Sequence, residues 1–293
     1  MATQASCVPM DKHLSKQACV ARLLSHQATG TAVALFVVLW TVAMLVRIAL
    51  AAIRWGELDH DPSALLAAIG RGAAIDALLA FATAALVLAF GALAHFGARE
   101  GAVRRARRTA GFALAVAAIG FVGVAEILFW EEFGVRFNFI AVDYLIYTVE
   151  VIGNIRESYP LPALLGGLAL FGAAVSWLRA RVWAVRAQAG WRLRVRVGVA
   201  LLAIFTAVGA ARIGVALNDG VESVAALRAS ARNQELARNG LASFAAALRD
   251  NELSYRRFYA TLGDAHAARL AGTWPRETAP ARPMRAAWTP ATR

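Results

Sequence analysis

Five long apolar stretches restrict what this chain can fold into. Each is close to the roughly 20 residues that a helix needs to cross the hydrocarbon core of a bilayer. They cover approximately residues 30–53, 73–96, 110–130, 161–178 and 195–211. Hydrophobic residues make up 59% of the chain, charged residues only 17%, and the mean hydropathy is +0.53. Because a water-soluble domain rarely combines these values, the sequence predicts an all-α, polytopic membrane protein with five transmembrane helices.

The basic residues predict how these helices are oriented. The net charge of +12 would suit a nucleic-acid-binding protein, but the arginines cluster beside the apolar stretches, so no nucleic-acid partner is expected. One side carries Lys12, Lys16, Arg22, Arg99, Arg104, Arg105, Arg107, Arg108, Arg179, Arg181, Arg186, Arg192, Arg194 and Arg196. The opposite loops carry only Arg54, Arg71, Arg136 and Arg156. The positive-inside rule places the richer side in the cytoplasm, with residues 1–29 as a cytoplasmic tail and the C-terminus outside.

Three ionisable residues interrupt the apolar stretches: Arg47, Asp76 and Glu126. Counting along the predicted helices places all three in the outer part of the bilayer, within roughly 10 Å of the outer ends at 1.5 Å per residue. A charge in hydrocarbon is costly unless it is paired or hydrated. We therefore expect either a structural cluster of ion pairs or a polar pocket for a lipid head group. A proton pathway is disfavoured because the inner halves of the helices are nearly free of polar groups.

The outer segment 131–160, between the third and fourth stretches, predicts an amphipathic helix over residues 137–155. Its polar stripe consists of Asp143, Tyr147, Glu150, Asn154 and Glu157, at i, i+4, i+7, i+11 and i+14. Such a helix lies along a membrane surface rather than through it. The loop has a net charge of −3. It could hold a divalent cation, dock a basic partner or bind hydroxyl-rich groups, or it could cap the bundle without doing chemistry.

Residues 212–262 change to a polar, helix-rich composition and predict an extracytoplasmic helical linker. Asn239 and Gly240 form a helix-end signal. The apolar face formed by Leu241, Phe244, Leu248, Tyr255, Phe258 and Tyr259 should pack on a following domain or on the membrane surface. Residues 263–293 are rich in Pro, Ala, Thr and Arg, without periodicity, and predict a disordered tail.

The residue types that usually carry chemistry are scattered along this chain. Cys7 and Cys19 offer neither a disulfide framework nor a metal-ligand spacing. The histidines form no metal-ligand constellation with nearby carboxylates. No catalytic residue, no metal ligand and no cofactor is therefore assigned to this chain.

Residues 136–160 read RFNFIAVDYLIYTVEVIGNIRESYP, and residues 233–262 read NQELARNGLASFAAALRDNELSYRRFYATL. These two segments resemble the membrane-anchored phosphoglycerol transferases, the lipoteichoic-acid-synthase-like proteins of the alkaline phosphatase and sulfatase superfamily. Five spans with the C-terminus outside are similar to the membrane part of that family, and the resemblance covers roughly residues 30–262.

The resemblance implies an enzyme at the outer face of the bacterial inner (plasma) membrane that takes a glycerol phosphate from phosphatidylglycerol. It also implies a large extracellular α/β domain with a Thr or Ser nucleophile and a divalent metal. That domain would begin shortly after residue 262, where no strand, nucleophile and helix pattern is found. We therefore expect either a fragment or frame-change product, which we favour, or a membrane-only paralogue.

The expected function is the anchoring and positioning part of such an enzyme, inactive alone. Its partners would be the lipid bilayer, phosphatidylglycerol head groups and a catalytic domain in the same chain. The alternative is a non-catalytic scaffold that binds an envelope protein through the acidic outer segment. A transporter is disfavoured because the spans lack midplane polar groups, broken helices and paired repeats.

Overall fold

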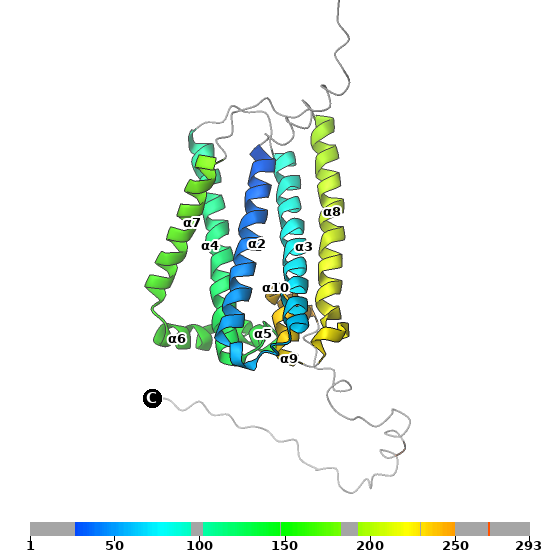
Figure 1. The fold of residues 1–293 in the computed structure, drawn as a ribbon. Coiled ribbons are helices and arrows are strands. Elements are labelled where there is room, and N and C mark those ends of the chain that lie inside the picture. The colour runs from blue at the N-terminus through cyan, green and yellow to red at the C-terminus, as the bar shows by residue number, and fades with distance from the viewer. Residues whose placement is uncertain are drawn as a thin grey trace, which may run out of the picture. The chain divides into compact units, whose positions relative to one another are not determined.

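The computed structural model describes residues 27–94, 102–146, 148–182, 193–228, 230–249 and Arg269. The chain divides into two compact units, Met1–Asn251 and Glu252–Arg293, and all the elements below belong to the first. Five long helices lie side by side (Figure 1): α2 (Gln27–Ile53), α3 (Pro62–Ala94), α4 (Ala102–Phe133), α7 (Leu161–Val182) and α8 (Leu193–Asp219). All five are long and apolar enough to cross a membrane. The described residues contain no strand, so the predicted all-α membrane fold with five spans is confirmed.

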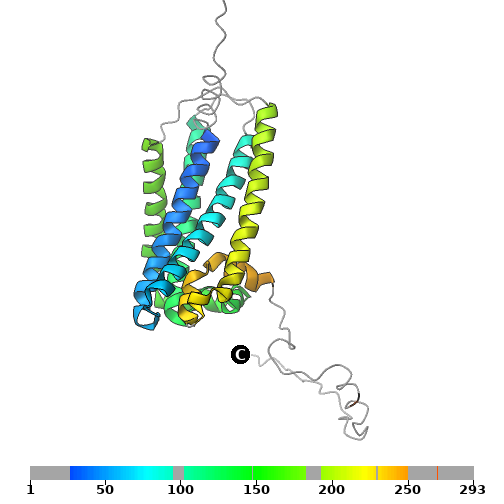
Figure 2. The same ribbon diagram turned by 45° about the vertical axis from the view of Figure 1, so that its right-hand side comes forward.

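The short helices gather at one end of this bundle in both ribbon views (Figures 1 and 2). They are η1 (Trp55–Glu57), α5 (Phe139–Ile146), α6 (Thr148–Ser158), η2 (Gly220–Ser223), η3 (Ala225–Leu227), α9 (Ala231–Ala237) and α10 (Gly240–Arg249). We call the end formed by residues 54–61, 134–160 and 220–249 the capped end. The opposite end, where α2, α4 and α8 begin and α3 and α7 end, is called the basic end because of its arginines.

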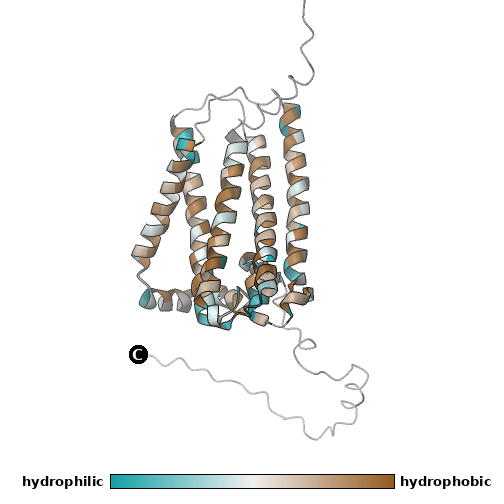
Figure 3. Ribbon diagram, viewed as in Figure 1, coloured by the Kyte–Doolittle hydropathy of each residue, from teal (hydrophilic) through white to brown (hydrophobic). Residues whose placement is uncertain are grey.

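The long helices pack in the order α8, α3, α2, α4, α7 (Figure 1). The buried apolar residues of the contact between α3 and α8 are alanines, which let two backbones approach closely without a large side chain between them. They are Ala82, Ala85, Ala89, Ala200, Ala203, Ala207 and Ala210. Helix α7 packs along α4 and is the least buried span. Apolar residues cover the middle of the helices and polar residues gather toward their ends (Figure 3), as lipid contact requires.

At the capped end, two long helices extend well beyond the apolar stretches that predicted them. Helix α3 begins at Pro62 rather than near residue 73, because Asp61 caps it by accepting a hydrogen bond from the Ala64 N–H at 3.1 Å. Helix α8 continues past residue 211 to Asp219. Its exposed Arg212 interrupts the apolar run but not the helix.

The outer segment is helical over most of residues 137–155, as the sequence predicts. The structure describes two helices, α5 and α6, and Tyr147 between them lies outside the described residues. Helix α5 begins at Phe139 because the Asn138 side chain accepts a hydrogen bond from the Ile140 N–H at 2.9 Å. Asp143 of the polar stripe lies on α5, and Glu150, Asn154 and Glu157 lie on α6.

Candidate functional site

The candidate site is a group of buried charges at the capped end, and its first pair joins α2 to α3. Arg47 Nη2 lies 2.7 Å from Asp76 Oδ2, and Arg47 Nε donates to the same oxygen at 3.2 Å. The side chains are 1% and 3% exposed. Gly72 leaves room for this guanidinium, because a Cβ at that position would overlap it. The structure thus brings together two of the three charges that the sequence places at a common depth.

The third charge, Glu126, has a partner that sequence reasoning missed. Glu126 on α4 forms an ion pair with Arg136, which comes ten residues later and is also buried. The chain reverses between them at Gly134, whose φ is +66° and whose N–H bonds the Trp130 carbonyl at 2.8 Å. A left-handed glycine is a common way to end a helix. This turn directs Arg136 back into the bundle rather than into the outer loop.

Both arginines also bind the last turn of α9. Arg47 Nη1 donates to the Leu236 carbonyl, and Arg136 Nη2 donates to the same oxygen at 3.4 Å. Arg136 Nε donates to the Glu235 carbonyl at 3.4 Å. The last carbonyls of a helix lack partners within it and carry partial negative charge. Two guanidinium groups satisfy them here, which fixes the end of α9 between α2 and the residues that follow α4.

The carboxylates meet the start of the next helix, α10. Asn239 caps α10 by accepting from the Ala242 N–H at 2.9 Å, and its Nδ2 donates to Asp76 Oδ1 at 2.7 Å. Gly240 lies against the Glu126 carboxylate, which a Cβ would overlap. Negative charge is favourable at a helix N-terminus. The turn between α9 and α10 therefore has arginines on its α9 side and carboxylates on its α10 side. We call Arg47, Asp76, Glu126, Arg136 and Asn239 the anchor network.

Two further asparagines hold the same turn in place. Asn233 on α9 is fully buried, and its amide bonds both backbone groups of Asp59, accepting from the N–H and donating to the carbonyl, each at 3.0 Å. Asn218 on α8 accepts from the Asn239 N–H at 2.8 Å. Buried amides of this kind are costly unless they are bonded. Residues 230–249 are thus tied to α2, α3, α4, α8 and the loop before α3.

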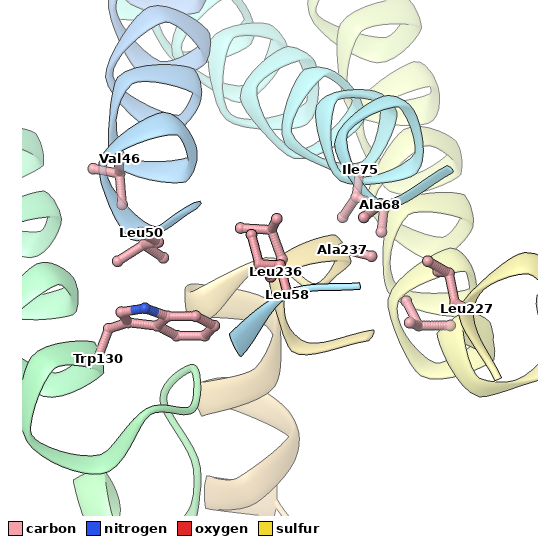
Figure 4. Packing of buried hydrophobic residues seen from close by; sticks show 10 residues of the cluster. Val46, Leu50, Leu58, Ala68, Ile75, Trp130, Leu227, Leu236 and Ala237 are labelled. Atoms are coloured by element: carbon pink, nitrogen blue, oxygen red, sulfur yellow. The ribbon is translucent and has the colours of Figure 1, made fainter. Parts of the chain in front are cut away.

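An apolar cluster packs around the last turn of α9. Figure 4 shows Leu236 and Ala237 of α9 packed among buried side chains from α2, α3, α4 and the chain after α8. The cluster comprises Val46, Leu50, Leu58, Ala68, Ile75, Trp130, Val221, Leu227, Leu236 and Ala237. Nearer the surface, Glu57 pairs with Arg54 at 2.7 Å and with Arg232. The hydrogen bond from Arg54, with the charge of Arg232, lowers the pKa of the Glu57 carboxyl.

The anchor network consists of charged side chains and one amide that have partners within the chain. Its two arginines balance its two carboxylates, and each of these groups has a partner. Within the described residues, no three His, Cys, Asp or Glu side chains gather as a metal site would require. Arg47 and Asp76 bond each other and the α9–α10 turn, and Glu126 bonds Arg136.

The acidic stripe is only partly visible. Asp143 on α5 and Glu157 on α6 are exposed. Glu150 and Asn154 lie on α6, but their side chains, like Tyr147, are outside the described residues. On its other face α5 buries Val142 and packs against α10. Further along the segment, Leu145, Ile152 and Ile155 are exposed. Among its described residues, the structure therefore buries the apolar side of this segment only around Val142.

The C-terminal segment departs most from the sequence-based prediction. Residues 212–262 were expected as a linker whose apolar face packs on a following domain or on the membrane surface, yet residues 220–249 fold back and pack on α3 and α5. Phe244 meets Phe137 edge-on at 6.2 Å, while Leu241 and Leu248 are exposed. Tyr255, Phe258 and Tyr259 lie outside the described residues. The helix-end signal at Asn239 and Gly240 does separate α9 from α10, and it was the one sequence sign of this turn.

Comparison of the chain with protein-family models, with curated proteins and with solved structures finds no match. The function is therefore argued from the anchor network, from the elements that it joins and from the resemblance of residues 136–160 and 233–262.

Proposed function

We propose that this chain anchors and positions a phosphoglycerol-transferase-like catalytic unit at the outer face of the bacterial inner membrane. In this proposal it acts on phosphatidylglycerol-type lipids only together with that unit and has no turnover alone. One observation carries the proposal: the two segments that resemble the family pack against each other. Arg136 binds Glu235 and Leu236, and Phe137 contacts Phe244, although about one hundred residues separate the partners.

The anchor network supports a positioning role rather than a simple tether. A domain attached through a flexible linker samples many orientations, which lowers its effective concentration at a membrane-bound substrate. Here the chain leaves α10 at Arg249 after being bonded to α2, α3, α4 and α8. A catalytic unit attached at that point would start from a fixed place beside the lipid surface. Holding reactants in place in this way can contribute several kcal/mol to catalysis.

The charge distribution supports the orientation in this proposal. The described Asp and Glu residues all lie at the capped end or in the half of a long helix that leads to it, whereas the described charged residues of the basic end are all arginines. The positive-inside rule then assigns the basic end to the cytoplasm and the capped end to the outside. The docked residues 230–249 would face the outer leaflet, where phosphatidylglycerol is reached.

A chimera tests the positioning role. Residues 1–262 would replace the membrane part of a lipoteichoic-acid-synthase-like enzyme, and transfer of glycerol phosphate would be followed in proteoliposomes containing phosphatidylglycerol. We expect the chimera to be active. Replacing residues 230–249 with a Gly/Ser linker of equal length should lower its rate about tenfold or more, because the loss of orientation raises the barrier.

Three results would count against this proposal. One is an inserted and folded chimera without transfer, and another is a linker variant as active as the intact chimera. The third comes from the chain alone, which serves as the control and is expected to release no glycerol phosphate with or without Mn²⁺. Turnover by the chain alone would contradict the statement that it needs a catalytic unit.

A second candidate function is a scaffold for an envelope protein. Exposed carboxylates at the capped end favour it, since Glu131, Glu132, Asp143 and Glu157 all face away from the core. A basic partner surface would complement them. An inactive but correctly inserted chimera would favour this function over the first.

A further inference from the structure

We propose that the basic end holds the phosphate group of an anionic membrane lipid between α2, α4 and α7. This site lies at the end opposite to the anchor network and does not depend on the proposed function. The described residues of this end include arginines from α4, α7 and α8 but no Asp or Glu. Positive charge beside a bilayer attracts anionic head groups, and basic sites between transmembrane helices are suited to bind them.

Arg179 is the residue around which the site is built. It lies in the last turn of α7, and its guanidinium stacks over the ring of Phe112 on α4 at 4.3 Å from the centroid. Its Nη1 donates to Thr31 Oγ1 on α2 at 3.1 Å. Its Nε is buried and has no hydrogen-bond partner among the described residues. Three helices thus fix one guanidinium whose visible partners are neutral.

Helix α4 adds cations on the face that Arg179 contacts. Arg105 and Arg108 precede Phe112 by seven and four residues, so all three share one face of the helix. Arg105 is exposed. The N-terminus of α2 adds the partial positive charge of its helix dipole, since Thr31 lies one turn after Gln27. A phosphate with two free oxygens fits such an arrangement, because guanidinium groups bind it through paired hydrogen bonds.

The surroundings of Arg179 indicate that the anion belongs to a lipid. Trp177 is 59% exposed, and the guanidinium of Arg181 lies over its ring at 4.8 Å. An exposed tryptophan beside an arginine near the end of a span is typical of the head-group level of a bilayer. Leu170 and Leu178 on the same helix are exposed and would contact acyl chains. The bound phosphate would therefore be attached to a hydrophobic tail.

A lipid at this place would tie α7 to its neighbours. Helix α7 has only 11% of its apolar window buried, the lowest share of the five spans. At Gly172 it lies so close to α4 that a Cβ would overlap the carbonyl oxygen of Ala113. A phosphate hydrogen-bonded to α2, α4 and α7 would link these three helices at the basic end. Binding of the anionic lipid should then stabilise the folded protein, because a ligand that binds only the native state raises the unfolding midpoint.

The experiment measures lipid binding to the purified full chain by native mass spectrometry and by thermal unfolding. Phosphatidylglycerol, phosphatidylcholine and free inorganic phosphate are the three probes. We expect phosphatidylglycerol to bind more tightly than phosphatidylcholine and to raise the unfolding midpoint, and inorganic phosphate to do neither. The double variant Arg105→Gln/Arg179→Gln should weaken phosphatidylglycerol binding about tenfold or more, as expected for lost charge-assisted hydrogen bonds.

A matched control removes the same charge from the same end. Arg107 lies two residues from Arg105 and so on another face of α4, and Arg194 is exposed on α8. The double variant Arg107→Gln/Arg194→Gln should weaken phosphatidylglycerol binding less than about threefold, because the proposed site uses particular arginines rather than the total positive charge of this end. The single variant Arg105→Gln changes an exposed residue, so it should keep the fold while weakening phosphatidylglycerol binding. It provides the test if the double variant Arg105→Gln/Arg179→Gln does not fold.

Four outcomes would overturn the proposal. They are equal losses in the two double variants, unchanged binding in Arg105→Gln/Arg179→Gln, equal affinity for phosphatidylglycerol and phosphatidylcholine, and binding of inorganic phosphate as tight as that of the lipid.

Discussion

Replacing Asp76 with leucine is expected to lower the free energy of unfolding by about 3–5 kcal/mol, the usual effect of leaving one charge of a buried ion pair without its partner. Arg47 would keep its charge in a site that is 1% exposed. Asn239 Nδ2 would lose the acceptor that it now has at 2.7 Å. The change therefore removes the contact of α3 with both the arginine of α2 and the cap of α10.

Reversible denaturation in mixed micelles measures this effect. Asp143→Leu is the control, because Asp143 is exposed on α5 and should change the free energy of unfolding by less than about 1 kcal/mol. The double variant Arg47→Leu/Asp76→Leu should be more stable than Asp76→Leu, since it leaves no buried charge unpaired. Values for Asp76→Leu within about 1 kcal/mol of the unchanged protein would show that the pair does not hold the helices together.

Replacing Arg136 with methionine is expected to release residues 230–249 from the bundle. Glu126 would remain buried without its partner, and the Leu236 carbonyl would lose one of its two arginines. A loss of about 3 kcal/mol in docking raises the population of the open form roughly a hundredfold. Trypsin should then cleave after Arg232 and Arg238 faster by about that factor, because cleavage follows the open population.

Arg156→Met provides the comparison for this experiment. Arg156 is exposed on α6 and is not a member of the anchor network, so its replacement should leave cleavage after Arg232 and Arg238 unchanged. If Arg136→Met also leaves these cleavage rates unchanged, the segment is held by the apolar cluster alone and the network has no anchoring role.

The long helices could be predicted from the sequence because their signal is local. About twenty consecutive apolar residues indicate a transmembrane helix independently of the rest of the sequence. The common depth of Arg47 and Asp76 could be predicted for a related reason, since α2 and α3 are antiparallel and rise by a fixed distance per residue. The structure places these two charges 2.7 Å apart.

The partner of Glu126 could not be predicted in the same way. Arg136 lies in a loop by sequence, and its return to the bundle depends on the left-handed turn at Gly134. The docking of α9 was missed because Asn233 and Glu235 give its sequence the polar character of a linker. Their acceptors and donors, the backbone of Asp59 and the N–H of Arg136, are distant in the sequence. Polar residues that are buried and bonded look exposed until their partners are known.

Amide hydrogen exchange of the protein in lipid nanodiscs tests most directly whether residues 230–249 are part of the bundle. The Asn239 and Ala242 amides donate to Asn218 Oδ1 and Asn239 Oδ1 inside the capped end. Docking predicts that amides of α9 and of the first turns of α10 exchange about a thousandfold or more slowly than in an unstructured peptide, equivalent to an opening free energy of about 4 kcal/mol. Exchange within about tenfold of the rate in an unstructured peptide would contradict the docked arrangement. It would also contradict the role of this end in positioning a catalytic unit.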